Sequence, residues 1–252
     1  MKKQDKHFIY IKQLYPLATS VVKPITVGLM HDIYITESQN QKFVCRFSDK
    51  IVAQHNLEIS KLLNQYGIPA PKVSIHNCGD CWCETYPFIP GKTLHERILE
   101  GLSGEKLDAV YHQMFDISYK ISEIPYENIK PIPMPFVSKI LRKSISCLNL
   151  SQKKLCHTDL HAKNIILDEQ DNVRAILDLD AFYTESMTVA YFVMLKDSQT
   201  YGYDLNRLNE ILNKLNIRNI GTHINIINTA TKMYHFVFPE CLRKQLLKIR
   251  VK

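Results

Sequence analysis

The sequence predicts an α+β protein of two parts, a strand-rich first third and a mostly helical remainder. Short β-branched and aromatic runs separated by polar turns fill the chain up to about residue 88, with one helix among them. From Thr93 onward, apolar residues recur at helical spacing, most clearly over 104–123. We therefore expect two domains, 1–88 and 89–252.

The strand-rich part contains two predicted hairpins with a helix between them. Strands are expected within 21–36 and over 43–47, followed by a helix over 51–66. Gly67 and the Pro69-Ala70-Pro71 segment end that helix. The second hairpin occupies 72–88 and turns at Gly79-Asp80.

Arg46 is the basic residue of the strand over 43–47. Alternation along a strand places Arg46 on the face opposite Cys45 and Phe47. Glu58 is the one acidic residue inside the helix that follows. A solvent-facing arginine and a solvated helix glutamate are one interpretation of these residues.

The second hairpin carries His76, Cys78, Cys81 and Cys83. Imidazole and thiolate groups are zinc ligands, so a zinc site is one interpretation. The sequence lacks a second Cys-x-x-Cys pair, and alternation places Cys81 and Cys83 on one strand face. Partly buried thiols in a reduced protein are the preferred interpretation.

A polar loop in the helical part carries the strongest chemical signal. His157, Asp159 and Asn164 lie within eight residues, immediately before an apolar run, and Asp178 ends the next apolar run. A polar turn at 169–172 joins the two runs, which predicts a β-hairpin with both polar clusters at one side. A carboxylate can orient and deprotonate a hydroxyl, whereas Asn and Asp oxygens suit Mg²⁺. This combination is typical of phosphoryl transfer from a metal-bound nucleotide, with His157 bracing the loop backbone.

The pattern H-x-D-x-x-x-x-N, a hairpin and then D-x-[DE]-x-A resembles the aminoglycoside phosphotransferase and choline kinase family. The resemblance implies a two-lobed protein-kinase-like fold, with a small β-rich N-terminal lobe for the nucleotide and a mostly helical C-terminal lobe. It also implies that Asp159 is the catalytic base, with His157 beside it in the catalytic motif. Asn164 and Asp178 would bind Mg²⁺, and Asp180 occupies a position where this family often carries another acid.

The family likeness extends into the first third of the chain. Gly28 and Tyr34 match a nucleotide-covering loop, although His31 replaces the usual Asn. Arg46, supported by Glu58, would hold the phosphates of ATP or GTP. Further along, 84–94 resembles the connector between lobes, and the backbone at Tyr86 and Phe88 would contact the base.

The resemblance implies a kinase that transfers the γ-phosphate to a hydroxyl of a small molecule, such as an aminoglycoside or choline. The chain lacks the A-P-E and D-F-G signatures of protein kinases. Three helices predicted at 204–215, 223–236 and 239–249 contain few acidic residues to bind a polycationic acceptor. An atypical protein kinase or ATPase and a non-catalytic nucleotide-binding scaffold of the same fold remain alternatives.

Composition bears on the expected partners and cellular compartment of the protein. The net charge is +7 and the pI is about 8.9, which is too mild a basic balance to indicate a nucleic-acid partner. The longest apolar stretch, 189–195, is far shorter than the ~20 residues of a membrane span. Seven cysteines without a secretory signal favour a reduced, cytoplasmic protein. The sequence does not indicate an oligomeric state.

Overall fold

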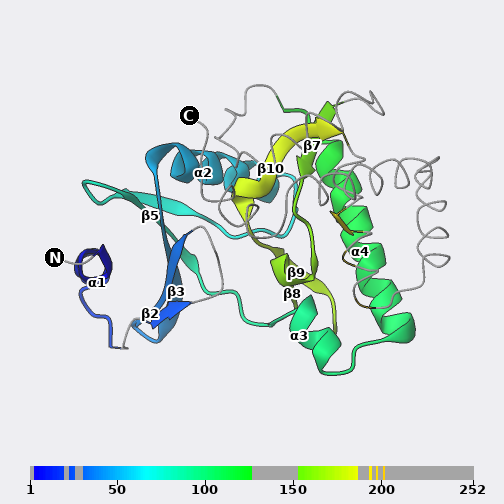
Figure 1. Cartoon of the computed structure of the whole chain (residues 1–252), viewed down its shortest axis with the longest axis horizontal. Coiled ribbons are helices and arrows are strands. Elements are labelled where there is room, and N and C mark those ends of the chain that lie inside the picture. Colours follow the sequence, from blue (N-terminus) through cyan, green and yellow to red (C-terminus); the bar gives the residue numbers. More distant parts are fainter. Residues whose placement is uncertain are drawn as a thin grey trace, which may run out of the picture. The chain divides into compact units, whose positions relative to one another are not determined.

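The computed structural model describes residues 3–19, 23–25, 31–126, 153–186, 193–194, 197 and 201. The chain divides into two compact units, Met1–Pro90 and Gly91–Lys252. The first unit is built on a sheet, and the second contains two described α-helices together with short strands, as Figure 1 shows. The division lies close to the boundary expected after Phe88.

The first unit contains a five-stranded antiparallel sheet in the order β1-β2-β3-β5-β4. A two-residue turn joins β2 to β3, and both of its residues, Gln39 and Asn40, have positive φ (52° and 61°). Such turns match the right-handed twist of paired strands, and Asn tolerates them well. The strands are β1 (Lys23–Ile25), β2 (Asp32–Ser38), β3 (Gln41–Ser48), β4 (Ser74–Asn77) and β5 (Trp82–Pro87).

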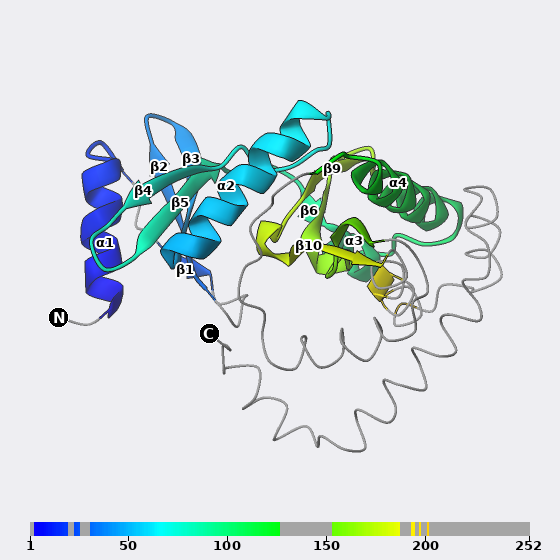
Figure 2. The same cartoon turned by 90° about the horizontal axis from the view of Figure 1, so that it is seen from above.

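Helices cover both faces of this sheet. Figure 2 shows α1 (Lys3–Leu14) and α2 (Lys50–Gln65) on opposite sides of it. The α1 side is an apolar cluster with Ile11, Tyr34 and Phe47 at its centre. The α2 side carries Arg46, because residues alternate between faces along β3. The expected alternation along this strand is confirmed.

Helix α2 has clear start and stop signals. The Asp49 carboxylate accepts a hydrogen bond from the Val52 amide at 2.9 Å, which caps the first turn. Gly67 adopts φ +69° just after the helix, and the Ile68 amide donates to the Leu63 carbonyl at 2.9 Å. This is the Schellman arrangement, which glycine accommodates best.

The second unit combines two helices with short strands around the polar loop. Helix α4 lies beside β7 and β9, and its buried side chains include Val110, Met114 and Phe115. The strands form a β10-β7 pair and a β6-β8-β9 sheet. The elements are β6 (Lys92–Thr93), α3 (Leu94–Leu99), α4 (Gly104–Ser122), β7 (Lys153–His157), η1 (Ala162–Asn164), β8 (Ile165–Leu167), β9 (Val173–Ile176), η2 (Leu179–Ala181) and β10 (Phe182–Ser186).

Gly91 allows the first strand of the second unit to pair with the β8–β9 hairpin. Its φ is +142°, and a Cβ atom there would lie 2.2 Å from the Leu167 carbonyl oxygen. No side chain fits at that distance. Glycine is therefore required for β6 to approach β8 at this point.

Most predicted elements of the described ranges are present, including both hairpins of the first unit, the helix between them and the hairpin at 165–177. Among the described residues, no group of three or more His, Cys, Asp or Glu side chains could hold a metal ion, and the five cysteines are all thiols. The zinc interpretation is therefore not supported there. No described helix is long and apolar enough to cross a bilayer. Gly28 and the predicted tail helices lie outside the described residues.

Candidate active site

The polar loop runs from the end of β7 to the start of β8, in the second unit. Asp159 lies at its outer edge with a side chain that is 53% exposed, so its carboxylate is open to a hydroxyl in solution. Leu160 and Ala162 beside it are buried. The loop is thus anchored by its small and apolar residues and presents its acid outward.

His157 joins the two polar segments of the site. Its Nε2 donates to the Leu177 carbonyl at 2.9 Å, and its Nδ1 accepts from the Asp159 amide at 3.1 Å. The ring is 1% exposed and packs edge-on against Phe182. Complete burial lowers the pKa of His157, although the bond to Leu177 opposes this effect. His157 therefore braces the loop in its neutral form, and the catalytic role expected for it is that of a positioning residue, because its buried ring cannot reach a substrate.

Asn164 forms one further bond within the loop and one to the second segment. Its Nδ2 donates to the Asp159 carbonyl at 2.9 Å, and its backbone carbonyl accepts from the Leu177 amide at 2.8 Å. These bonds turn the amide nitrogen toward the loop. The Oδ1 atom accepts no hydrogen bond from the described residues, so it is available to a ligand.

Asp178 has an unusual backbone conformation. It lies directly after Leu177 with φ 63° and ψ 58°, the left-handed region that few residues other than glycine adopt. The Ala181 amide donates to its carbonyl at 3.0 Å, and the Thr158 amide donates to the Ala181 carbonyl at 2.9 Å. The turn is therefore fixed to the catalytic loop, and the exposed Asp178 carboxylate lies at the same end of the hairpin as Asn164.

This donor set suits a hard cation. The Asn164 Oδ1 and the Asp178 carboxylate are oxygen ligands, and Mg²⁺ typically takes one or two protein oxygens and completes its shell with water and phosphate. Asp180 lies in the η2 turn and is partly exposed. The residues present therefore fit the metal that the sequence pattern implies.

Two residues of the loop environment were not selected from the sequence. His161 lies with its Nε2 3.6 Å from the Asp159 carboxylate, and Asp197 accepts a hydrogen bond from the Ala162 amide at 2.7 Å. Burial alone would lower the pKa of His161, but Asp159 and Asp197 outweigh it and raise that pKa. No sequence pattern singles out Asp197. Its hydrogen bond to the loop backbone does so in the structure.

Arg46 belongs to a buried polar network in the first unit. Register places it opposite Glu84 on β5, and its Nη1 donates to Glu84 Oε2 at 3.3 Å. Glu84 also accepts from Ser48 at 2.6 Å and from Asn56 at 2.8 Å. All four residues are at most 9% exposed.

The expected pairing of Arg46 with Glu58 is therefore wrong. The buried stripe of α2 contains Val52, Asn56, Ile59 and Leu63, which leaves Glu58 on the exposed face of the helix. The acid that pairs with Arg46 comes from a neighbouring strand instead. Glu58 has no role in the candidate site.

The connector residues Tyr86 and Phe88 follow Glu84 on the chain. Tyr86 lies opposite Val44 in the β3–β5 pairing, and the Phe88 amide donates to the Lys42 carbonyl at 2.8 Å. The Phe88 amide is thus already used by the sheet. Their expected contact with the nucleotide base remains a prediction.

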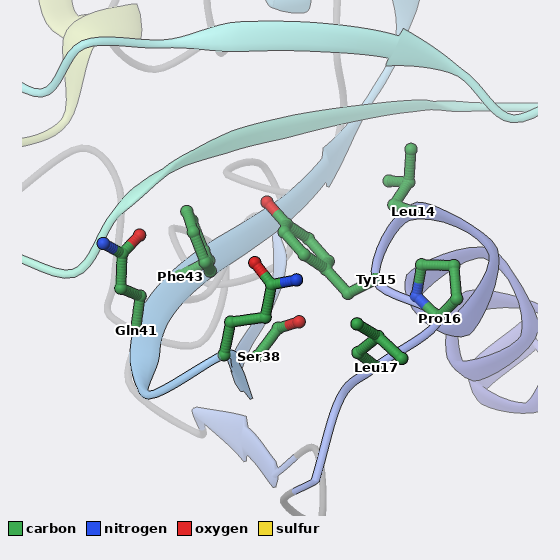
Figure 3. Close-up of a pocket in the computed structure, with 8 residues that line it drawn as sticks. Leu14, Tyr15, Pro16, Leu17, Ser38, Gln41 and Phe43 are labelled. Atoms are coloured by element: carbon green, nitrogen blue, oxygen red, sulfur yellow. The ribbon is translucent and has the colours of Figure 1, made fainter.

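A pocket of about 220 Å³ lies elsewhere in the first unit, between the end of α1 and the β2–β3 turn, as Figure 3 shows. Tyr15 and Phe43 stack in its wall with ring centroids 4.8 Å apart. Its volume is below the roughly 300 Å³ of small ligand sites. None of the candidate catalytic residues lines it.

No family model matches the chain, and no curated protein matches it by sequence. Solved structures do match. The ADP-bound aminoglycoside phosphotransferase APH(2'')-Ib aligns over 98% of this chain and 97% of its own, with a TM-score of 0.65 and 13% identity. The GDP complex of aminoglycoside 2'-phosphotransferase-IIIa aligns over 90% of this chain and 87% of its own, with a TM-score of 0.65 and 15% identity. Macrolide 2'-phosphotransferase type I aligns over 100% of this chain and 99% of its own, with a TM-score of 0.60 and 14% identity.

This chain has the protein-kinase-like fold of these phosphotransferases. The fold predicted from the motif at 157–178 is therefore confirmed, and the neighbours include members of the family that this motif resembles. Both lobes are covered, because the alignments extend over nearly the full length of each chain.

Proposed function

We propose that the chain is a nucleotide-dependent phosphotransferase that moves the γ-phosphate of ATP or GTP to a hydroxyl of a small molecule. The observation that carries this proposal is the exposed Asp159 carboxylate, on a loop whose backbone is held by His157 and Asn164 and joined to Leu177, just before Asp178. The fold shared with nucleotide-bound phosphotransferases supports the reaction class. Aminoglycoside-, choline- or similar-type alcohols are the acceptors that the family resemblance implies.

In this mechanism Asp159 accepts a hydrogen bond from the acceptor hydroxyl and takes its proton as the oxygen attacks phosphorus. Positioning supplies most of the rate in phosphoryl transfer, which explains why the loop is so extensively bonded to its surroundings. Asn164 and Asp178 would hold Mg²⁺, which neutralises charge on the phosphates when bound. Arg46 would stabilise the same phosphates, with Glu84 holding the guanidinium in place.

The test is nucleotide consumption, measured by coupled ADP or GDP release with Mg²⁺ across a panel of aminoglycosides, choline, ethanolamine, thiamine, homoserine and sugars. We expect acceptor-dependent turnover that Asp159→Asn lowers by about 10²–10⁴-fold, the usual contribution of a general base. The Asp159 side chain is exposed, so this variant should fold normally. Glu58→Gln, an exposed carboxylate on α2, is the matched control and should retain activity.

Phosphate transfer to proteins in place of these acceptors would identify an atypical protein kinase. Failure to bind either nucleotide in the presence of Mg²⁺ would refute the proposal and favour a scaffold of the same fold.

A further inference from the structure

The tip of the β4–β5 hairpin carries a Cys-x-x-Cys sequence, Cys78-Gly79-Asp80-Cys81, that the proposed phosphotransfer does not use. It lies in the first unit on the sheet face that α1 covers. Two thiols at this spacing can act as a chemical unit only if the backbone brings them together.

The register of the hairpin places the two cysteines directly opposite each other. His76 pairs with Cys83 and Asn77 pairs with Trp82, and the Cys78 amide continues the ladder by donating to the Cys81 carbonyl at 2.9 Å. Opposite residues of an antiparallel pair share a sheet face, with Cα atoms about 4.5–5.5 Å apart. This separation is within the ~4.4–6.8 Å range of disulfides.

The two thiols differ in their exposure to solvent. Cys81 is partly exposed, whereas Cys78 is 5% exposed, so an external reagent reaches Cys81 more easily. Burial, together with the neighbouring Cys81 thiol, raises the pKa of Cys78 to about 11. Lys6 of α1 forms an ion pair with Asp80 of the turn at 2.6 Å. Both Lys6 and Asp80 interact with Cys81, so exposure is the property that separates Cys81 from Cys78.

We propose that Cys78 and Cys81 form a redox-active dithiol that a low-molecular-weight disulfide, such as oxidised glutathione, converts to an intramolecular disulfide. The Cys81 thiolate attacks one sulfur of the reagent, forming a mixed disulfide and releasing one thiolate. Cys78 loses its proton to water and its sulfur attacks the Cys81 sulfur, which releases the second thiolate. Two cysteine thiols are oxidised, and the reagent is reduced to two thiols.

The other cysteines of this face are not part of the dithiol. Cys45 and Cys83 are fully buried in the cluster under α1, where no reagent reaches them without unfolding. Oxidation of this face in the folded chain should therefore stop at the hairpin tip. This selectivity separates a built dithiol from general oxidation of a cysteine-rich protein.

The experiment treats the native, reduced full-length chain with oxidised glutathione, quenches with acid, alkylates the remaining thiols in denaturant and measures the intact mass. In the wild type, Cys78 and Cys81 should lose their alkylatable thiols without carrying glutathione, whereas Cys45 and Cys83 should keep theirs. Peptide mapping should place the disulfide between Cys78 and Cys81, and dithiothreitol should reverse it.

Variants assign the roles of the two cysteines. Cys78→Ser should stop at a stable glutathione adduct on Cys81, and Cys81→Ser should keep all its remaining thiols. Cys147→Ser removes one thiol outside the described residues and should still form the disulfide. Because Cys78 is buried, Cys78→Ala serves as a second variant, and near-ultraviolet circular dichroism verifies that each variant is folded.

Three results would overturn the proposal: a wild type that keeps seven thiols, a wild type that accumulates the same adduct as Cys78→Ser, or a disulfide that maps to other cysteines. None of these readouts depends on nucleotide turnover, so the dithiol stands or fails separately from the proposed phosphotransfer.

Discussion

At the residue scale, the candidate site is held together mainly by side chains that bond to backbone groups. His157 contacts one amide and one carbonyl, Asn164 bonds the Asp159 carbonyl, and Thr158 donates to the Ala181 carbonyl at 2.9 Å. Because these bonds end on backbone atoms, they fix the course of the loop backbone from which the Asp159 side chain projects. The site is therefore prepared before any ligand binds.

The buried neutral state of His157 makes stability depend on pH. Because burial lowers its pKa in the folded chain, the unfolded chain binds more protons once the pH falls below about 6.5. Stability is then lost progressively as the pH falls further, and it is fully present above the unfolded pKa. We expect the advantage of the wild type over His157→Gln to shrink between pH 8 and pH 5, measured by urea denaturation.

A His112→Gln variant provides the control, since His112 is on the surface of α4 beside Asp116. If the wild type and His157→Gln lose stability in parallel over this pH range, the histidine is not held neutral.

The two glutamates near α2 allow a direct test of the buried network. Glu84→Gln should lower the free energy of unfolding by about 3–5 kcal/mol, because it removes the buried carboxylate that pairs with the Arg46 guanidinium. Glu58→Gln should change it by less than about 0.5 kcal/mol, as expected for an exposed position. Chemical denaturation of the two variants measures both effects. Equal losses would restore the pairing expected from the sequence.

At the scale of elements, the hairpin of β8 and β9 brings the polar residues to one end and joins them to β6 through a close approach at Gly91. Gly91→Ala should be strongly destabilising, because its Cβ would lie 2.2 Å from the Leu167 carbonyl oxygen and its φ of +142° is strained for alanine. The strain alone costs of order 1–3 kcal/mol.

Gly101→Ala is the matched control for this prediction. Gly101 also has a positive φ, +103°, but nothing lies within 4 Å of its Cβ position. Thermal denaturation should show a larger loss for Gly91→Ala than for Gly101→Ala. Similar losses would mean that the close approach to β8 is not required.

Local features of these elements could be predicted from the sequence, whereas contacts between distant residues could not. Hairpins and helices were predictable because alternation, helical spacing and turn residues act over a few positions. The partner of Arg46 was not, because it depends on the β3–β5 register, which pairs residues 38 positions apart. The buried face of α2 was likewise not predictable, because it contains the polar residue Asn56 as well as apolar residues. Asp197 was missed because its contact with Ala162 spans 35 positions.

At the scale of the whole molecule, the polar residues of interest are divided between the two units, with Arg46 in the first and Asp159, Asn164 and Asp178 in the second. A nucleotide that binds the folded chain alone stabilises it by mass action. At 100 times its dissociation constant the gain is about 2.7 kcal/mol. We expect Mg-ATP or Mg-GTP to raise the melting temperature.

Removal of the metal tests the assigned ligands in the same assay. Excess EDTA should reduce the nucleotide-induced shift, and Asp178→Asn should reduce the dependence on Mg²⁺, because it removes a carboxylate ligand. A shift that is the same with and without Mg²⁺ would contradict the metal site at Asn164 and Asp178. Differential scanning fluorimetry with each nucleotide is sufficient.

The left-handed backbone at Asp178 has a consequence for anyone who selects variants of this chain. A glycine adopts φ 63° without the steric cost that an aspartate bears, so replacement by glycine should improve thermal resistance while removing the carboxylate. A screen that rewards heat tolerance alone would therefore tend to enrich inactive clones at this position. Libraries that aim for a robust catalyst should hold position 178 constant and screen for turnover as well as survival.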